Sequence, residues 1–222
     1  LYGQHLELTM PKGKIEAEVQ YIGRQGAKFA LAAAAVADVL GVKHDDIAKG
    51  LTHLQHFAGR MQVLSGVKNS TLIDDTYNAS PVAVMAALDV LYGAKAPQRI
   101  ALLGNMNELG EHSAAAHKEV GDYCDAKKLD LVLTLGEDAN KYLALAAKAK
   151  GCTVKTCKSP YEAGKYIEEH MAEGAAVLAK GSQNGVFAEE ALKPLLADKT
   201  DEAKLVRQSA YWLKRKQQQF PR

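Results

Sequence analysis

The chain contains 222 residues, of which 47% are hydrophobic and 24% are charged, and its formal net charge at pH 7 is +2. This length accommodates one large domain, or one domain and part of another, and the composition is that of a soluble globular protein. The nearly balanced charge gives no overall field that would favour nucleic acid, and no apolar run reaches the roughly 18 residues of a membrane-spanning helix. Three cysteines without metal-ligand spacing indicate reduced thiols in a cytoplasmic protein.

The first part of the chain predicts a hairpin followed by two helices. Residues 1–22 alternate polar and apolar side chains around a Pro11-Lys12-Gly13 turn, which is typical of a β-hairpin. A helix is predicted over residues 27–40, and a shorter one begins at His44. Because the strand pattern is already present at the first residues, we expect the chain to be the last part of a longer protein.

From residue 63 onward, short apolar runs alternate with helical patterns. This alternation predicts a Rossmann-like α/β fold, with a mostly parallel sheet and helices on both of its faces. Ser113 and Ser159 are expected to cap the helices that they precede or begin. The predicted strands lie near 70–74, 99–103, 130–135, 153–157 and 175–179, and the predicted helices near 81–92, 113–127, 138–150, 160–173 and 186–197.

The first candidate site follows the strand that ends at Asp74-Asp75. The polar run Thr76-Tyr77-Asn78-Ala79-Ser80 comes next, and Pro81 suits the first position of a helix. In open α/β sheets, ligands bind beyond the carboxyl ends of the strands, so these side chains are candidates for a binding site. The same residue types also form ordinary turns between a strand and a helix, and chemistry alone leaves both interpretations open.

Two further strands end in polar loops. Gly104-Asn105-Met106-Asn107-Glu108-Leu109-Gly110 follows one strand, and its spacing is neither that of a dinucleotide fingerprint nor that of a phosphate-binding loop. Lys180-Gly181-Ser182 follows the last strand. Without a binding role, the first segment would be a tight connection between a strand and a helix, and Lys180 would be an ordinary lysine at the end of a strand. His112 and His117 are five residues apart, do not share a helix face, and are expected to be surface or capping residues.

Taken together, these three segments resemble the signatures of the Mur ligases that attach D-alanyl-D-alanine to a peptidoglycan precursor. The family signatures are Asp-Asp-(Ser/Thr)-Tyr-Asn-Ala-x-Pro, Gly-(Asp/Asn)-Met-x-Glu-Leu-Gly and Lys-Gly-Ser, in the same order. The resemblance extends from about residue 23 to residue 196. It implies that residues 1–62 end a central ATP-binding α/β domain, that residues 63–197 form the C-terminal Rossmann-like domain, and that residues 198–222 form a basic helical tail.

The resemblance also implies binding-site residues. It identifies no particular residue of this chain as catalytic or as a metal ligand. Arg60 corresponds to the arginine of a Gly-Arg pair before the last domain. The nucleotide-binding candidates are Arg60, Asp75 for the ribose hydroxyls, Tyr77 and Asn78. The substrate-binding candidates are Asn105, Lys180 and Ser182, with Lys180 expected to reach over the crevice toward the incoming dipeptide.

The implied activity is ATP-dependent amide formation by a cytoplasmic, monomeric enzyme. Such ligases use ATP and Mg²⁺ to convert the carboxylate of UDP-N-acetylmuramoyl-tripeptide to an acyl phosphate, which the amine of D-alanyl-D-alanine attacks. The glycine-rich phosphate loop of the family is missing from these 222 residues, so we expect the chain alone to be inactive. The alternatives are a ligase for another amino acid, disfavoured by the absence of an Asn-Pro-Arg signature, and a non-catalytic nucleotide-binding or interaction module.

Some positions depart from the family pattern. Gln25 and Phe29 stand where the family often has histidine and an adenine-binding asparagine, which removes a hydrogen bond to the base. Ser80 replaces the more common asparagine. The tail has no acidic residue from Lys204 onward, and it either binds an acidic partner, a membrane surface or nucleic acid, or packs its aromatic residues on the domain with its lysines in solvent.

Overall fold

The computed structural model describes residues 3–221, which form two compact units divided between Phe57 and Ala58. Each unit has its own core, and the two are described separately. Leu1, Tyr2 and Arg222, which the predicted hairpin and tail include, lie outside the described residues. No helix within the described part of the chain combines the length and apolarity needed to cross a bilayer.

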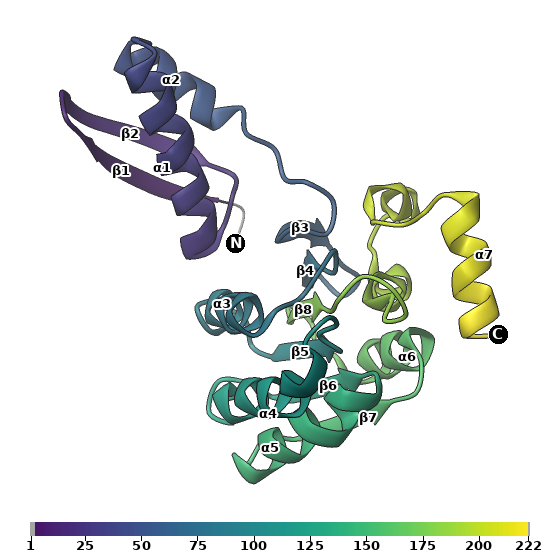
Figure 1. Cartoon of the computed structure of the whole chain (residues 1–222). Helices are drawn as coiled ribbons and strands as arrows, with labels where there is room; N and C mark the ends of the chain where they lie inside the picture. The colour runs from purple at the N-terminus through teal and green to yellow at the C-terminus, as the bar shows by residue number, and fades with distance from the viewer. Residues whose placement is uncertain (1–2, 222) are drawn as a thin grey trace. The chain divides into compact units, whose positions relative to one another are not determined.

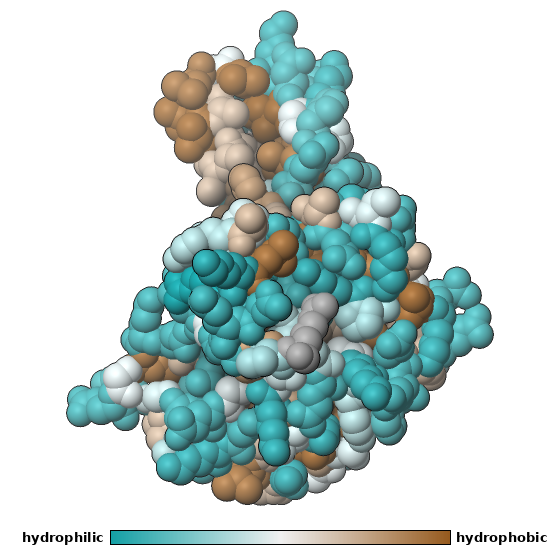
Figure 2. All heavy atoms as spheres, turned by 90° about the vertical axis from the view of Figure 1, so that its right-hand side faces the viewer, coloured by the Kyte–Doolittle hydropathy of each residue, from teal (hydrophilic) through white to brown (hydrophobic). Residues whose placement is uncertain are grey.

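The smaller unit confirms the predicted hairpin and helices. Strands β1 (Gln4–Met10) and β2 (Gly13–Val19) pair antiparallel, and helices α1 (Gly23–Val39) and α2 (His44–Thr52) pack against them. Alternate strand residues share a core with one face of each helix, as the strand period of two and the helix period of 3.6 require. Elsewhere on this unit hydrophobic residues gather at the surface (Figure 2), and the exposed ones in α1 include Phe29, Val36 and Val39.

The larger unit is built on the predicted mostly parallel sheet (Figure 1). The strand order is β3-β4-β8-β5-β6-β7, and only β3 runs antiparallel to its neighbour, β4. The four inner strands are almost wholly buried, as expected when helices cover both faces, whereas the edge strands β3 and β7 are partly exposed. The strands are β3 (Gln62–Ser65), β4 (Thr71–Asp75), β5 (Arg99–Gly104), β6 (Leu131–Leu135), β7 (Val154–Cys157) and β8 (Ala176–Lys180).

Helices cover the two faces of this sheet unequally. Figure 1 shows α3 (Pro81–Tyr92), α4 (Ser113–Tyr123) and α5 (Ala144–Ala149) on one face, and their mutual contacts place them in one layer. Helix α6 (Pro160–His170) lies on the other face with short 3₁₀ turns from residues 188–195. The three cysteines are free and buried, and burial raises the pKa of the Cys124 and Cys157 thiols to about 12.

Several local predictions were wrong in detail. Strand β3 was not predicted, because four residues are too few to show a clear period. The helix predicted over 186–197 is a pair of 3₁₀ turns: Phe187 adopts a left-handed conformation (φ 51°) and Pro194 lacks a backbone donor. Ser113 does not cap α4, because its hydroxyl donates to Asp138 instead. Ser159 does cap α6 by accepting from the Glu162 amide at 3.1 Å.

The C-terminal tail packs on the larger unit. It contains a 3₁₀ segment (Lys199–Lys204) and helix α7 (Ala210–Gln219), and the Trp212 ring meets Phe187 edge-on at 6.1 Å between centroids. Packing of the tail's aromatic residues on its own domain is therefore confirmed for Trp212, whereas Tyr211 is 62% exposed. The expectation that its lysines lie in solvent is wrong for Lys216, which is 1% exposed.

Candidate functional site

Three of the predicted site residues leave the sheet at the same edge. Strand β8 lies between β4 and β5, and Lys180 at its carboxyl end is level with Asp75 on one side and Leu103 on the other. Asn105 directly follows β5, and its carbonyl accepts a hydrogen bond from the Ser182 amide at 2.9 Å. The parallel strands thus bring Asp75, Asn105 and Lys180 together, as the sequence predicts.

Asp75 and Lys180 form a buried ion pair. The Lys180 ammonium lies 2.5 Å from Oδ2 of Asp75 and donates to the Asn78 carbonyl at 2.9 Å, while Oδ1 of Asp75 accepts from the Met61 amide at 3.1 Å. Burial raises the pKa of the Asp75 carboxyl, and the Lys180 ammonium acts in the opposite direction. Lys180 is 2% exposed, so its ammonium holds the turn after β4 rather than projecting over the crevice.

Arg60 and Tyr77 form an exposed platform beside this ion pair. The Arg60 guanidinium carbon lies 4.2 Å from the centroid of the Tyr77 ring, and Tyr77 is 42% exposed. The Tyr77 amide donates to the Gly59 carbonyl at 3.0 Å, which fixes the linker residues against the turn. An aromatic face beside a guanidinium suits a planar, anionic ligand. Arg60, Asp75, Tyr77 and Asn78 are therefore brought together.

Asp74, which is not among the predicted site residues, has a different environment from Asp75. It is fully buried, and its Oδ1 accepts from the Thr76 amide at 3.1 Å and the Thr76 hydroxyl at 2.6 Å. Its Oδ2 has no hydrogen-bond partner among the described residues. Burial raises the pKa of Asp74 to about 6. Successive strand residues point to opposite faces of a sheet, and this alternation separates the two carboxylates.

Asn105 and Ser182 use their side chains to join loops. Oδ1 of Asn105 accepts from the Ala139 amide at 2.8 Å, and Oγ of Ser182 accepts from the Asn107 amide at 2.9 Å. Next to them lies a cavity of about 270 Å³ beyond the carboxyl ends of β5 and β6. Its lining includes Asn105, Asn107, Gly136, Glu137, Lys158 and Asn184.

His117 is not the surface or capping residue that the sequence suggests. It is fully buried in α4, and its Nε2 accepts from the Met106 amide at 3.0 Å. Its Nδ1 lies 2.8 Å from the Ser113 carbonyl, so the ring carries its proton on Nδ1 in this arrangement. His117 thereby anchors the loop after β5. His112 is exposed, as expected.

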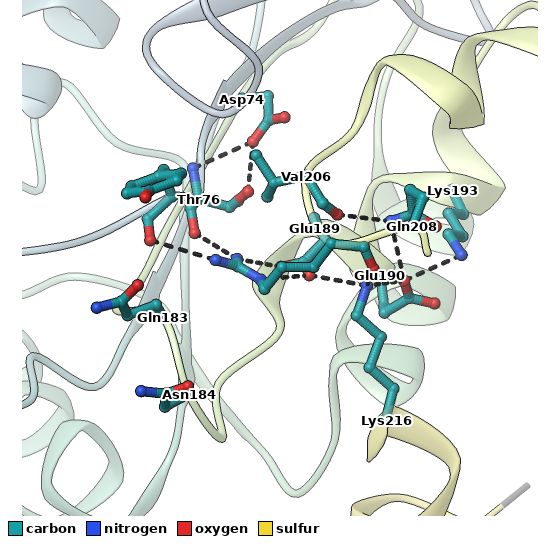
Figure 3. A network of polar contacts seen from close by, with 12 residues as sticks. Asp74, Thr76, Gln183, Asn184, Glu189, Glu190, Lys193, Val206, Gln208 and Lys216 are labelled. Carbon is teal, nitrogen blue, oxygen red and sulfur yellow. Dashed lines mark hydrogen bonds and ion pairs between the residues drawn. The ribbon is translucent and has the colours of Figure 1, made fainter. Parts of the chain in front are cut away.

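A charged cluster beside the turn was not predicted (Figure 3). Glu189, Glu190 and Lys216 are at most 2% exposed, and Arg207 contacts both the cluster and the turn. A usable signal was present: Glu189-Glu190 interrupts a run of apolar residues, and buried acids require cationic partners. Within residues 3–221, no group of three or more His, Cys, Asp or Glu side chains is placed to hold a metal ion.

Comparison with known proteins agrees with this fold and these loops. Residues 59–183 match the family described as "Mur ligase, glutamate ligase domain", and the chain belongs to the Mur ligase family. Among its curated relatives, UDP-N-acetylmuramoyl-tripeptide--D-alanyl-D-alanine ligase of Haemophilus influenzae is 37% identical over 82% of this chain and 40% of its own length. The protein of the same name from Escherichia coli is 30% identical over 85% of this chain and 41% of its own length.

A solved structure has a similar fold. A crystal structure of MurF from Acinetobacter baumannii superposes with a TM-score of 0.73 at 28% identity, covering 90% of this chain and 43% of the other. The chain thus spans about two fifths of the length of the relatives that it matches.

Proposed function

We propose that this chain forms the C-terminal part of an ATP-dependent ligase that joins D-alanyl-D-alanine to UDP-N-acetylmuramoyl-tripeptide. The observation that carries the proposal is the convergence of three signature loops at one sheet edge, in a chain 37% identical to a ligase of that name. The activity requires an acyl phosphate to be protected from water. Loops at one edge of a domain that closes on another provide such protection.

The nucleotide side of the site consists of Arg60, Asp75, Tyr77 and Asn78. The Tyr77 ring and the Arg60 guanidinium offer a stacking surface and a fork of donors for phosphate or ribose oxygens. Asp75 keeps free lone pairs on both oxygens and is the candidate partner of the ribose hydroxyls. A relative from Thermotoga maritima, 24% identical, was solved in complex with ADP, which accords with a nucleotide site in this fold.

The substrate side consists of Asn105, Lys180 and Ser182. Asn105 lines the cavity of about 270 Å³, and Ser182 is hydrogen-bonded to Asn107 in its lining. Lys180 is paired with Asp75 and the Asn78 carbonyl. We therefore propose that Lys180 affects dipeptide binding indirectly, by holding the turn after β4 in place. Direct contact between Lys180 and the dipeptide would require the ion pair with Asp75 to open. Glu137 and Lys158 in the cavity lining carry charges opposite to those of a zwitterionic dipeptide.

The described residues do not fit a magnesium site. Asp74 is buried and Asp75 is held by Lys180, so no cluster of free oxygen ligands remains. We therefore propose that Mg²⁺ and the ATP phosphates bind mainly to the part of the relatives that this chain does not cover, and that the chain alone is inactive. In this proposal the enzyme is monomeric and cytoplasmic. Its central domain ends with residues 1–62, its C-terminal domain is formed by residues 63–197, and the tail of that domain is formed by residues 198–222.

Phosphate release by the intact protein that contains these residues tests this function. With ATP and UDP-N-acetylmuramoyl-tripeptide, release should depend on D-alanyl-D-alanine, and diaminopimelate should not replace the dipeptide. The matched control is the 222-residue chain alone, which should release no phosphate. Release that is indifferent to the dipeptide would contradict the proposed specificity.

A further inference from the structure

Arg207 connects the C-terminal tail to the turn that follows β4. Its Nη2 donates to the Thr76 carbonyl at 2.6 Å and its Nη1 to the Tyr77 carbonyl at 3.2 Å. These two carbonyls lie between Asp75 and Asn78, within the proposed nucleotide site. Donors from one rigid guanidinium to two successive carbonyls fix the orientation of both peptide planes.

Arg207 is itself held in one orientation by Glu189. Its Nε lies 2.8 Å from Oε1 and its Nη2 lies 2.6 Å from Oε2 of that carboxylate, and the two side chains are 6% and 0% exposed. A bidentate pair of this kind fixes geometry as well as charge. The backbone of Arg207 is in the left-handed region (φ 56°), a conformation that a non-glycine residue keeps only where its surroundings determine it.

Lys216 of α7 completes the support. Its ammonium lies 2.8 Å from Glu189 and 2.7 Å from Glu190, and it donates to the Arg207 carbonyl at 2.8 Å. Figure 3 shows Lys216 reaching Glu189 and Glu190 from the helix, with Thr76 and Asp74 on the opposite side of the cluster. The placement of α7 is therefore linked through two buried acids to the turn after β4.

Close packing leaves this turn little freedom on its other side. A Cβ atom at Gly59 would lie 2.9 Å from Cγ1 of Val206 and 3.0 Å from the Tyr77 amide nitrogen. Only glycine permits this approach, and its φ of +65° is a second reason for its presence. The linker at Gly59, the turn at Tyr77 and the tail at Val206 therefore meet at one point, beside Arg60.

We propose that Arg207 is a positioning residue for the nucleotide site. Anchored by Glu189 and Lys216, it fixes the Thr76 and Tyr77 peptides so that Asp75 and the Tyr77 ring stay in the arrangement that receives the nucleotide. The inference rests on the proposed function, because the nucleotide role of Asp75 and Tyr77 belongs to it. It adds a role for the C-terminal tail on the nucleotide side of the proposed site.

Hydrogen exchange in the 222-residue chain tests the positioning without any ligand. In Arg207→Lys, which keeps the charge beside Glu189, the Thr76 and Tyr77 amides should exchange at least about tenfold faster than in the parent chain. Arg215→Lys, an exposed arginine of the same tail, is the matched control. Ile100→Val changes the core far from this turn, and it shows how much faster the amides exchange when only the stability of the domain is reduced. Exchange in Arg207→Lys no faster than in these two variants would overturn the proposal.

Kinetics of the intact ligase test the link to the nucleotide. Arg207→Lys and Arg207→Ala should raise the KM for ATP by about 10- to 100-fold and leave the KM for D-alanyl-D-alanine unchanged, and added guanidinium ion should partly restore Arg207→Ala. Asp75→Ala separates the two hypotheses. If Asp75→Ala raises the KM for ATP and Arg207→Ala does not, the positioning role is wrong and the site stands. If neither variant changes it, the nucleotide site itself is wrong.

Discussion

The buried carboxyl of Asp74 should make the stability of the larger unit depend on pH in an unusual direction. Most folded carboxylates have lowered pKa values and stabilise a protein as the pH rises. The pKa of Asp74 is instead raised from 3.8 to about 6, so the folded state binds its proton more tightly than the unfolded state. Between about pH 4 and pH 6, this group makes the protein less stable as the pH increases.

The size of this effect follows from the shift. A difference of about two pKa units at 1.36 kcal/mol per unit corresponds to about 3 kcal/mol of unfolding free energy. The contribution is fully favourable below the unfolded pKa of 3.8, where both states are protonated. It is lost as the pH rises through the folded value of about 6. The change Asp74→Asn removes the titration, while the amide oxygen can still accept from Thr76.

The measurement is urea denaturation of the 222-residue chain from pH 4 to pH 7, followed by the fluorescence of Trp212. This is the only tryptophan and lies in the larger unit, so its signal reports on that unit. The free energy of Asp74→Asn relative to the parent should rise by about 3 kcal/mol over this range.

Comparing the two proteins at each pH cancels the titration of all other groups. Asp198→Asn is the control with the opposite sign, because hydrogen bonds from Thr200 lower the pKa of Asp198. A difference between Asp74→Asn and the parent that stays constant from pH 4 to pH 7 would refute the buried, weakly solvated state of Asp74.

Three further changes probe the same region. Lys216→Met should lower the free energy of unfolding by about 3–5 kcal/mol in urea denaturation, because it leaves Glu189 and Glu190 buried without this ammonium, whereas exposed Lys214→Met should have little effect. Under the proposed function, Tyr77→Ala should raise the KM for ATP of the intact protein while changing the unfolding free energy of the 222-residue chain by no more than about 1 kcal/mol; unchanged nucleotide kinetics would remove the ring from the proposed site. Gly59→Ala should lower the free energy of unfolding by about 1–3 kcal/mol more than Gly151→Ala does. Both glycines have a positive φ, but only at Gly59 would the added Cβ overlap with neighbouring atoms, so equal melting curves for the two variants would contradict the close packing.

The sequence predicted the order of elements well because periodicity is a local property. The hairpin and the strand–helix alternation each repeat over enough residues to be recognised. The position of β8 between β4 and β5 is not visible in any local pattern, because it depends on pairing between segments about 100 residues apart. The turns at residues 188–195 were mistaken for a helix because their apolar spacing is helical, while the backbone at Phe187 is not.

The candidate site was predicted in outline for a related reason. Polar residues at the ends of parallel strands must meet at one edge, so Asp75, Asn105 and Lys180 could be placed together without coordinates. Their partners could not. The pairing of Lys180 with Asp75 spans 105 positions and that of Arg207 with Thr76 spans 131, and no rule of spacing connects such residues. Two features of the sequence hinted at the second pairing: the adjacent acids Glu189 and Glu190 interrupt an apolar run, and the tail has no acidic residue from Lys204 onward.

The tail's charges bear on where the folding unit ends. A domain that stopped at residue 197 would keep Glu189 and Glu190 in its interior while losing Arg207 and Lys216. Glu190 would keep its pairing with Lys193, whereas Glu189 would lose the two cations that contact it here. A buried carboxylate in that position would take up a proton or draw water into the core, and the Thr76 and Tyr77 carbonyls would lose their Arg207 donor. Since residues 58–221 belong to one compact unit, we infer that the tail is an integral part of the domain, and that the turn bearing the proposed nucleotide-site residues depends on it.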